Sequence, residues 1–108
     1  MKELTDETFV KEIYKKEVLV DCYAQWCGVC KMLKPKLEDL KWIEVLGLDV
    51  DKCPETSKKL GINNLPTLIL YREGKEVKRG IFDLLKELKW EPVDNVGIWI
   101  NVKTHPVR

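Results

Sequence analysis

The chain has 108 residues, of which 44% are hydrophobic, and a formal net charge of +1. This length predicts a single domain over residues 1–108, and the near-zero charge implies neither nucleic acid nor an anionic membrane as a partner. No apolar run approaches the ~20 residues that span a membrane, and the start, MKELTDETFV, lacks the apolar segment of a signal peptide. We therefore expect a cytoplasmic location, and four cysteines that serve chemistry rather than a disulfide scaffold.

The first half of the chain alternates between helical and strand patterns. Apolar residues at helical spacing predict a first helix over 6–16, and the nearly continuous apolar run at 18–24 is typical of a strand buried on both faces. A second helical pattern begins at Cys27 and contains Pro35, which cannot donate to the helix ladder and should bend it. The apolar run at 42–50 then predicts a returning strand, parallel to the first.

The second half is predicted to begin with a short helix and a hairpin. Pro54 and Gly61 stand where a helix begins and ends, because proline suits the first turn and glycine the position just past the last. Two β-rich runs, at 66–71 and 75–81, are separated by the turn signal REG. Strands and helices in this order predict an α/β fold with a mixed sheet.

The final part of the chain carries two further patterns. Leucines at helical spacing predict a helix near 82–90, and alternation of apolar residues over 96–102 predicts an additional strand. This strand is either an extra edge strand or a dimer contact, and the alternative is a disordered tail, which the β pattern and Trp99 argue against.

The stretch VDCYAQWCGVCKM places two cysteines where the second helix begins. Disulfide exchange needs a thiolate with a lowered pKa and a second thiol near enough to resolve the mixed disulfide. Cys27 is close to the free amide groups at the helix start, and Cys30 lies one turn inside, within reach. Lys31 adds positive potential, and Gly28 lets a partner approach the backbone closely. Cys27 is thus the predicted nucleophile and Cys30 the resolving thiol.

A CxxC motif alone is not specific, because zinc ribbons use the same spacing. A four-cysteine zinc site needs a second CxxC, which this chain lacks, so we expect no bound metal. Cys22 is predicted to be a buried, inert thiol on the opposite face of the sheet from Asp21. Cys53 precedes Pro54 at a helix start, which predicts an exposed thiol with a lowered pKa, or else an incidental loop thiol.

Several motifs, in order, are similar to those of one family. VLVDCYAQWCGVCKMLKP, followed by LDVDKCPETSKKLGINNLPTLILYREGKEVKRG, resembles the thioredoxin family over about residues 4–90. The resemblance implies the thioredoxin fold, a central mixed β-sheet flanked by helices, and a thiol-disulfide oxidoreductase that reduces protein disulfides through a reversible Cys27–Cys30 couple. It also implies protein disulfide substrates and a thioredoxin reductase-type electron donor, with no bound cofactor.

The resemblance further implies roles for individual residues. Asp21 is then a buried acid beneath the thiols, Trp26 flanks the nucleophile, and Pro66 follows a cis bond that leaves the backbone of Leu65 free to pair with a substrate segment. Gly80 resembles the glycine that lines the substrate groove in this family. We therefore expect Trp26, Gly28, Leu65, Pro66 and Gly80 to bind substrate.

Elementary chemistry supports some of these roles and leaves alternatives open. A lone acid in an apolar strand resists ionisation, so Asp21 should have a raised pKa and can take or return a proton while Cys30 attacks. The alternative is a carboxylate held by hydrogen bonds with no catalytic part. Trp26 as a core aromatic, and Pro66 as an ordinary trans proline at a strand start, are the corresponding alternatives.

The chain also departs from the family pattern. Val29 replaces the proline usual between the cysteines, which leaves isomerase or oxidase activity open, and Gly47 stands where a lysine usually neighbours the buried acid. Residues 91–108 have no counterpart and form an atypical C-terminal extension. A non-catalytic binding module with the same fold is a further alternative, but scaffolding alone does not require the acid, the tryptophan, both cysteines and the proline together.

Overall fold

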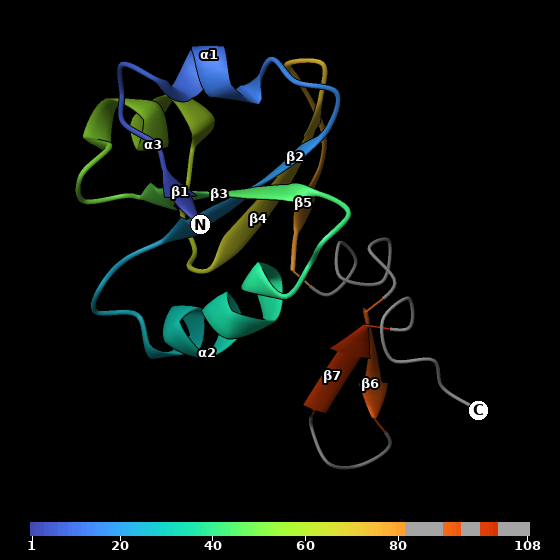
Figure 1. The fold of residues 1–108 in the computed structure, drawn as a ribbon. Helices are drawn as coiled ribbons and strands as arrows, with labels where there is room; N and C mark the ends of the chain where they lie inside the picture. Colours follow the sequence, from blue (N-terminus) through green and yellow to red (C-terminus); the bar gives the residue numbers. More distant parts are fainter. Residues whose placement is uncertain (82–89, 94–97, 102–108) are drawn as a thin grey trace.

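The computed structural model describes residues 1–81, 90–93 and 98–101, the last two segments by their backbone (Figure 1). Helices and strands alternate through most of this range. In chain order they are β1 (Lys2–Glu3), α1 (Phe9–Ile13), β2 (Val18–Tyr23), α2 (Gly28–Glu38), β3 (Glu44–Asp49), α3 (Pro54–Leu60), β4 (Thr67–Arg72), β5 (Lys75–Gly80), β6 (Trp90–Val93) and β7 (Ile98–Asn101).

The main sheet has five strands in the order β1-β3-β2-β4-β5. Both β1 and β2 run parallel to β3, whereas β4 is antiparallel to β2 and to β5. The sheet is therefore mixed, and the predicted parallel strand pair and the predicted hairpin are confirmed. All six residues of the central strand β2 are buried, because it has hydrogen-bonded neighbours on both sides and helices over both faces.

Helices cover the two faces of the sheet unequally. Figure 1 shows α2 against one face, and α1 and α3 together against the other. On the α2 face, Leu33 and Leu37 of the helix pack with Leu19 and Leu68 of the sheet. Complete burial of a leucine side chain stabilises a fold by about 1.5–3 kcal/mol, so these leucines anchor the helix that begins at the cysteines.

On the opposite face, α1 packs against the sheet through Phe9 and Ile13, which join a core that includes Val20 and Cys22 of β2. The ring of Phe9 meets that of Tyr71 edge to face, with 5.9 Å between their centroids. Alternation along β2 therefore sends Leu19 and Asp21 to one face and their neighbours to the other, as the strand period requires.

Helix α1 is shorter than the predicted helix over 6–16, because the preceding residues form a turn. The backbone amide of Thr8 donates to the hydroxyl of Thr5 at 3.0 Å, and the amide of Thr5 donates to the hydroxyl of Thr8 at 2.9 Å. Asp6 reaches α3 instead of joining α1: its Oδ1 accepts hydrogen bonds from the amide of Thr56 at 2.9 Å and from its hydroxyl at 2.6 Å. These side chains compete with the helix for the backbone.

The predicted start of the second helix and both predicted ends of the third agree closely with the structure. Helix α2 contains Pro35, and α3 begins at Pro54. Gly61 follows α3 in the left-handed conformation, with φ 66° and ψ 42°, and its amide donates to the carbonyl of Lys58 at 3.1 Å. A residue with a side chain is strained there, which is why glycine is favoured just past a helix end.

The end of the chain differs from the prediction. The predicted helix near 82–90 falls mostly outside the described residues, and at Trp90 the structure has the first residue of strand β6. The predicted last strand is confirmed over the residues of β7, which pair antiparallel with β6 in a separate two-stranded sheet. The alternative prediction, that this segment adds an edge strand to the main sheet, is therefore wrong. Within the part of the chain that the structure describes, no helix is long and apolar enough to cross a membrane.

Candidate active site

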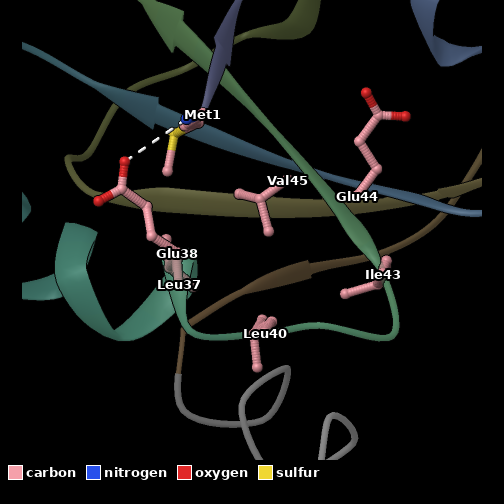
Figure 2. Close-up of a pocket in the computed structure, with 7 residues that line it drawn as sticks. All are labelled: Met1, Leu37, Glu38, Leu40, Ile43, Glu44 and Val45. Atoms are coloured by element: carbon pink, nitrogen blue, oxygen red, sulfur yellow. Dashed lines mark ion pairs between the residues drawn. The ribbon is translucent and has the colours of Figure 1, made fainter.

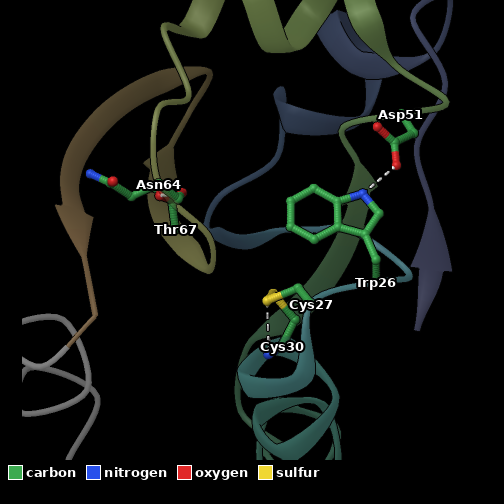
Figure 3. The surroundings of a disulfide bond; sticks show 6 residues. All are labelled: Trp26, Cys27, Cys30, Asp51, Asn64 and Thr67. Carbon is green, nitrogen blue, oxygen red and sulfur yellow. Dashed lines mark hydrogen bonds between the residues drawn. A yellow bond between two sulfur atoms is a disulfide. The ribbon is translucent and has the colours of Figure 1, made fainter.

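A disulfide joins Cys27 and Cys30 at the start of α2, with their Cα atoms 5.3 Å apart (Figure 3). Cys27 is the N-cap residue, and its Sγ accepts a hydrogen bond from the amide of Cys30 at 3.2 Å. The free amides and the positive end of the helix dipole thus point toward the sulfur of Cys27, as predicted. Because that amide can also stabilise a thiolate, the helix start favours exchange at this sulfur.

The two disulfide-bonded cysteines are both buried, with Cys27 8% and Cys30 3% exposed, but only one of them lines a pocket. Cys27 lines a pocket of about 370 Å³ together with Trp26, Val50 and residues 62–65, whereas Cys30 is outside the pocket lining. A partner entering this pocket meets Cys27 first. The order of attack expected from the sequence is therefore the one that access favours.

Trp26 lies at the surface beside the disulfide. Its side chain is 71% exposed, and its indole Nε1 donates a hydrogen bond to Oδ2 of Asp51 at 3.0 Å (Figure 3). The alternative of a core aromatic is therefore wrong. Val29 and Met32 are also largely exposed, so apolar side chains near the disulfide in sequence lie at the surface.

The loop before β4 forms the other wall of the pocket. The bond between Leu65 and Pro66 is cis, as the family resemblance implied, and the ordinary trans proline is wrong. Pro66 is buried and Leu65 is half-buried. The hydroxyl of Thr67 donates to the carbonyl of Asn64 at 2.6 Å, which holds the loop closed around the proline (Figure 3). The pairing of the Leu65 backbone with a substrate stays a prediction.

Two of the predicted glycines have open space where a side chain would be. Among the residues that the structure describes, a Cβ at Gly28 or at Gly80 would have no heavy atom within 4 Å apart from its own neighbours in the chain. Gly80 has φ 144°, a conformation that side chains disfavour, and it pairs with Leu68 at the end of β5. Both positions leave room for a partner's backbone, and their role in binding stays a prediction.

Asp21 is buried in β2 on the face that α2 covers. Only 1% of the residue is exposed, and its Oδ1 has no hydrogen-bond partner among the described residues. Burial, and next the negative charge of Glu3, raise the pKa of Asp21 to about 7, while Lys34 acts in the opposite direction. Lys34 lies one helical turn after Cys30 and therefore on the same side of α2. The raised pKa agrees with the prediction, and the missing partner argues against a carboxylate held by hydrogen bonds.

The other two cysteines are remote from exchange chemistry. Cys22 is fully buried on the α1 face, and burial raises its pKa to about 12, as expected of an inert thiol. The prediction of an exposed Cys53 with a lowered pKa is wrong, because its side chain turns inward and its Sγ donates to the carbonyl of Leu4 at 3.3 Å. Burial, followed by the charges of nearby carboxylates, raises the pKa of Cys53 instead.

Sequence reasoning missed four residues around the site: Glu3, Tyr23, Lys34 and Asp51. The hydroxyl of Tyr23 donates to Oε1 of Glu3 at 2.6 Å, and Nζ of Lys34 lies 5.7 Å from the centroid of the Tyr23 ring. Lys34 could have been predicted to lie near the site, because it is four residues after Cys30 on the same helix. No sequence pattern could have predicted Glu3, since the two residues of β1 are too few for a strand pattern.

Two further pockets lie away from the disulfide. One is a pocket of about 280 Å³ between the end of α2 and β3, where the Met1 amino group pairs with Glu38 at 3.5 Å (Figure 2). The other is a pocket of about 520 Å³ near Trp42 and Arg72. No group of three or more histidine, cysteine or acidic side chains within the described ranges could hold a metal ion.

These features together define a class of protein. A disulfide closed over the first turn of a helix, directly after the central strand of a mixed sheet and beside a cis-proline loop, is the site of a thiol-disulfide oxidoreductase. The model of the family described as Thioredoxin matches residues 1–84. The chain belongs to the thioredoxin family.

Individual relatives agree with this assignment. A thioredoxin of Chlamydia muridarum is 42% identical over 82 residues, which cover 72% of this chain and 80% of that protein. A thioredoxin of Mycobacterium bovis is 41% identical over 97 residues, covering 79% and 84%. A solved structure of Plasmodium falciparum thioredoxin, 30% identical, matches with a TM-score of 0.74 over 82% of this chain and 95% of that one.

The predicted thioredoxin fold and activity are thereby confirmed. The protein is a thiol-disulfide oxidoreductase, a protein-disulfide reductase that acts through Cys27 and Cys30. Membership of the family implies, in general terms, protein substrates and a reductase that supplies electrons. A non-catalytic binding module with this fold is not favoured.

Proposed function

We propose that Cys27 attacks a disulfide of a protein substrate, that Cys30 resolves the mixed disulfide, and that Asp21 accepts the proton of Cys30. The observation that carries the proposal is the placement of these groups. Cys27 lines the pocket, and the helix start points at its sulfur. The carboxyl of Asp21, whose Oδ1 has no hydrogen-bond partner among the described residues, lies on the face of the sheet that α2 covers. A buried carboxyl with a pKa of about 7 is suited to exchange a proton near neutral pH.

The proposed cycle balances in electrons and protons. The thiolate of Cys27 forms a bond with one sulfur of the substrate disulfide, and the other sulfur leaves as a thiolate. The sulfur of Cys30, on passing its proton to Asp21, then bonds to Cys27 and displaces the second substrate sulfur. Asp21 then returns its proton to one released substrate thiolate, and solvent protonates the other. The substrate thus gains two electrons and two protons, while Cys27 and Cys30 return to the disulfide seen here.

The substrate would lie along the pocket between Trp26 and the loop that ends at Pro66. The exposed indole and the neighbouring apolar side chains offer a surface for an unfolded or extended segment. Gly28 and Gly80 would admit the substrate backbone, and Leu65 would pair with it. This arrangement recognises backbone and apolar surface, so it suits protein substrates of varied sequence.

A reductase of the thioredoxin reductase type would return two electrons to the disulfide. No resident cofactor is needed, because the dithiol itself carries both electrons between donor and substrate. A reducing compartment such as the cytoplasm would keep the dithiol form available, and two of the four cysteines are buried thiols in the structure.

Substitution of each cysteine tests these roles. With a dithiol supplying electrons, we expect Cys27→Ser to abolish reduction of a protein disulfide. In a separate reaction, with pre-reduced protein and no free dithiol, we expect Cys30→Ser to accumulate a covalent complex with the substrate, because nothing resolves the mixed disulfide. Cys22→Ala removes a buried thiol outside the site and is the control, which should retain activity. Trapping by Cys27→Ser rather than Cys30→Ser, seen by mass spectrometry, would reverse the proposed roles.

The direction of electron flow is tested by the redox potential of the Cys27–Cys30 couple, measured in glutathione or dithiothreitol buffers. A reductase should have a potential near the roughly −270 mV of thioredoxins. A value closer to about −180 or −120 mV would instead indicate isomerase or oxidase work. The exposed side chain of Val29, in place of the usual proline, makes this measurement decisive.

A further inference from the structure

Three residues on adjacent strands form a row across the sheet beneath α2. Glu3 of β1 is in register with Gly47 of β3, which is in register with Asp21 of β2. Partners in a parallel sheet project to the same face, and two strand spacings of about 4.8 Å place the first and third members of the row roughly 10 Å apart. A glutamate and the buried aspartate are thus separated by a residue that has no side chain.

The side chain of Glu3 occupies the space above Gly47. A Cβ at that glycine would overlap the carboxylate of Glu3 and lie 2.9 Å from its Cδ. The carboxylate therefore leans along the row toward Asp21 rather than standing away from the sheet. Any larger residue in place of Gly47 would displace it, which gives a structural reason for glycine where the family usually has lysine.

Tyr23 holds this carboxylate in place. Its hydroxyl donates to Oε1 of Glu3 at 2.6 Å, a short hydrogen bond typical of a charged acceptor. Tyr23 is two residues after Asp21 on the same strand, and therefore on the same face. The tyrosine is 8% exposed, so the bond is anchored at the edge of the core, although Glu3 itself reaches solvent.

Charged and titratable groups face this region from every element packed against Asp21. They are the Met1 amino group, Glu3 of β1, Tyr23 of β2, Asp49 of β3, and Cys30, Lys34 and Glu38 of α2. On β4, the partner of Asp21 is the apolar Leu68.

Several of these groups are already engaged. The Met1 amino group pairs with Glu38, and Asp49 accepts hydrogen bonds from the amide of Asp51 at 3.0 Å and from Nε2 of Gln25 at 3.3 Å. Two full charges act on Asp21 beyond burial: Glu3 raises its pKa, and Lys34 lowers it.

We propose that Glu3, held by Tyr23 above Gly47, is a positioning residue whose negative charge controls proton acceptance by Asp21 and thereby the pH at which Cys30 resolves a mixed disulfide. The inference rests on the proposed role of Asp21. Removing the charge of Glu3 makes the anionic form of Asp21 more favourable, so resolution becomes fast at lower pH. Removing the charge of Lys34 has the opposite effect.

The test follows both steps of exchange with the reduced full-length protein and a chromogenic aromatic disulfide. Attack by Cys27 releases the first aromatic thiol, and resolution by Cys30 releases the second, so one stopped-flow trace reports both steps. In Glu3→Gln, which retains the shape of the side chain, we expect the pH midpoint of the second step to fall by at least about 0.3 unit. Coulomb's law gives this value in water for one charge at about 10 Å, and a carboxylate that leans toward Asp21 acts from a shorter distance. The shift should shrink in about 1 M salt.

Two other variants set the scale of the effect. Glu7→Gln removes an equal, exposed charge in the turn before α1, and its midpoint should match that of the unsubstituted protein. Lys34→Gln should raise the midpoint. A midpoint in Glu3→Gln equal to that in Glu7→Gln, or a rise instead of a fall, overturns the inference.

Asp21→Asn separates this inference from the proposed function beneath it. If the pH dependence of the second step disappears in Asp21→Asn but is unmoved in Glu3→Gln, only the role of Glu3 fails. If the pH dependence survives in Asp21→Asn, the proposed role of Asp21 fails, and the inference with it. Titration of the Asp21 carboxyl followed by NMR should show the same shift in Glu3→Gln as the kinetics.

Discussion

At the scale of single residues, neighbours in sequence have opposite environments. Asp21 and Cys22 are adjacent in β2, yet one faces α2 and the site, and the other faces α1 and an apolar core. The alternation of a strand was enough to predict this separation. Cys53 had no such pattern, and only its contact with Leu4, the residue after β1, revealed that its thiol is buried.

The burial of the two free thiols predicts their reactivity. In the disulfide form, Cys22 and Cys53 should both resist alkylation by iodoacetamide at about pH 8, at least about tenfold more slowly modified than in urea, because burial raises both pKa values and excludes the reagent. Mass spectrometry would count the modified thiols. Rapid labelling of Cys53 in the folded protein would contradict its buried placement.

At the scale of elements, the helices were predicted more reliably in position than in length. Helix α2 begins at the cysteines and α3 lies between Pro54 and Gly61, because proline and glycine act locally on the backbone. Helix α1 is shorter than its apolar pattern, because Asp6 hydrogen-bonds to Thr56 in α3, a partner 50 residues away. Local patterns cannot reveal a contact of that range.

The end of α3 offers a test of this local control. Gly61→Ala should lower the free energy of unfolding by about 1 kcal/mol, since alanine is strained at φ 66°. Gly61→Asn is the matched comparison and should lose less, because asparagine tolerates the left-handed conformation. Urea denaturation measures both. An alanine variant as stable as the original protein would show that the helix end relaxes without strain.

At the scale of the whole molecule, the sheet brings together residues from five strands in one row. Glu3, Gly47, Asp21, Leu68 and Gly80 are in register from β1 to β5. This row extends from an exposed edge, through the buried carboxyl, to the glycine at the end of β5. The order of the strands, which depends on long-range pairing, decides which residues are in register with Asp21 on the adjacent strands.

The buried carboxyl should also govern how the stability of the molecule depends on pH. Asp21 has a pKa of about 7 when folded, against an ordinary value of 3.8, so between these values the folded chain binds a proton that the unfolded chain has lost. The free energy of unfolding should therefore fall as pH rises from about 4 to about 7, by on the order of 4 kcal/mol at most.

Asp21→Asn removes this titration, so the free energy of unfolding should decline less with pH, and the variant should be more stable than the original protein at about pH 8.

Glu12 affects stability in a lower pH range. Its hydrogen bonds to Lys2 and Lys15 lower its pKa to about 2, so its contribution to the free energy of unfolding is lost only as pH falls from 4.5 toward that value. Denaturant melts across the pH range measure both effects. If Asp21→Asn and the unsubstituted protein had the same pH dependence of stability, folding would not raise the pKa of Asp21.

Features that depend on local chemistry could be predicted from the amino-acid sequence. The CxxC motif at a helix start, the buried strand before it, the hairpin and the class of reaction all follow from residue spacing and strand period. The cis bond and the roles of the substrate-binding residues came from family resemblance, not from the residues themselves. The binding roles remain predictions.

Features that depend on which strands meet became known from the folded structure alone. It placed Trp26 at the surface, buried Cys53, paired β7 with β6, and set Glu3 above Gly47 in the row that contains Asp21. The physical reason is that register and burial arise from contacts between segments far apart in the chain. Local propensity carries no information about those contacts.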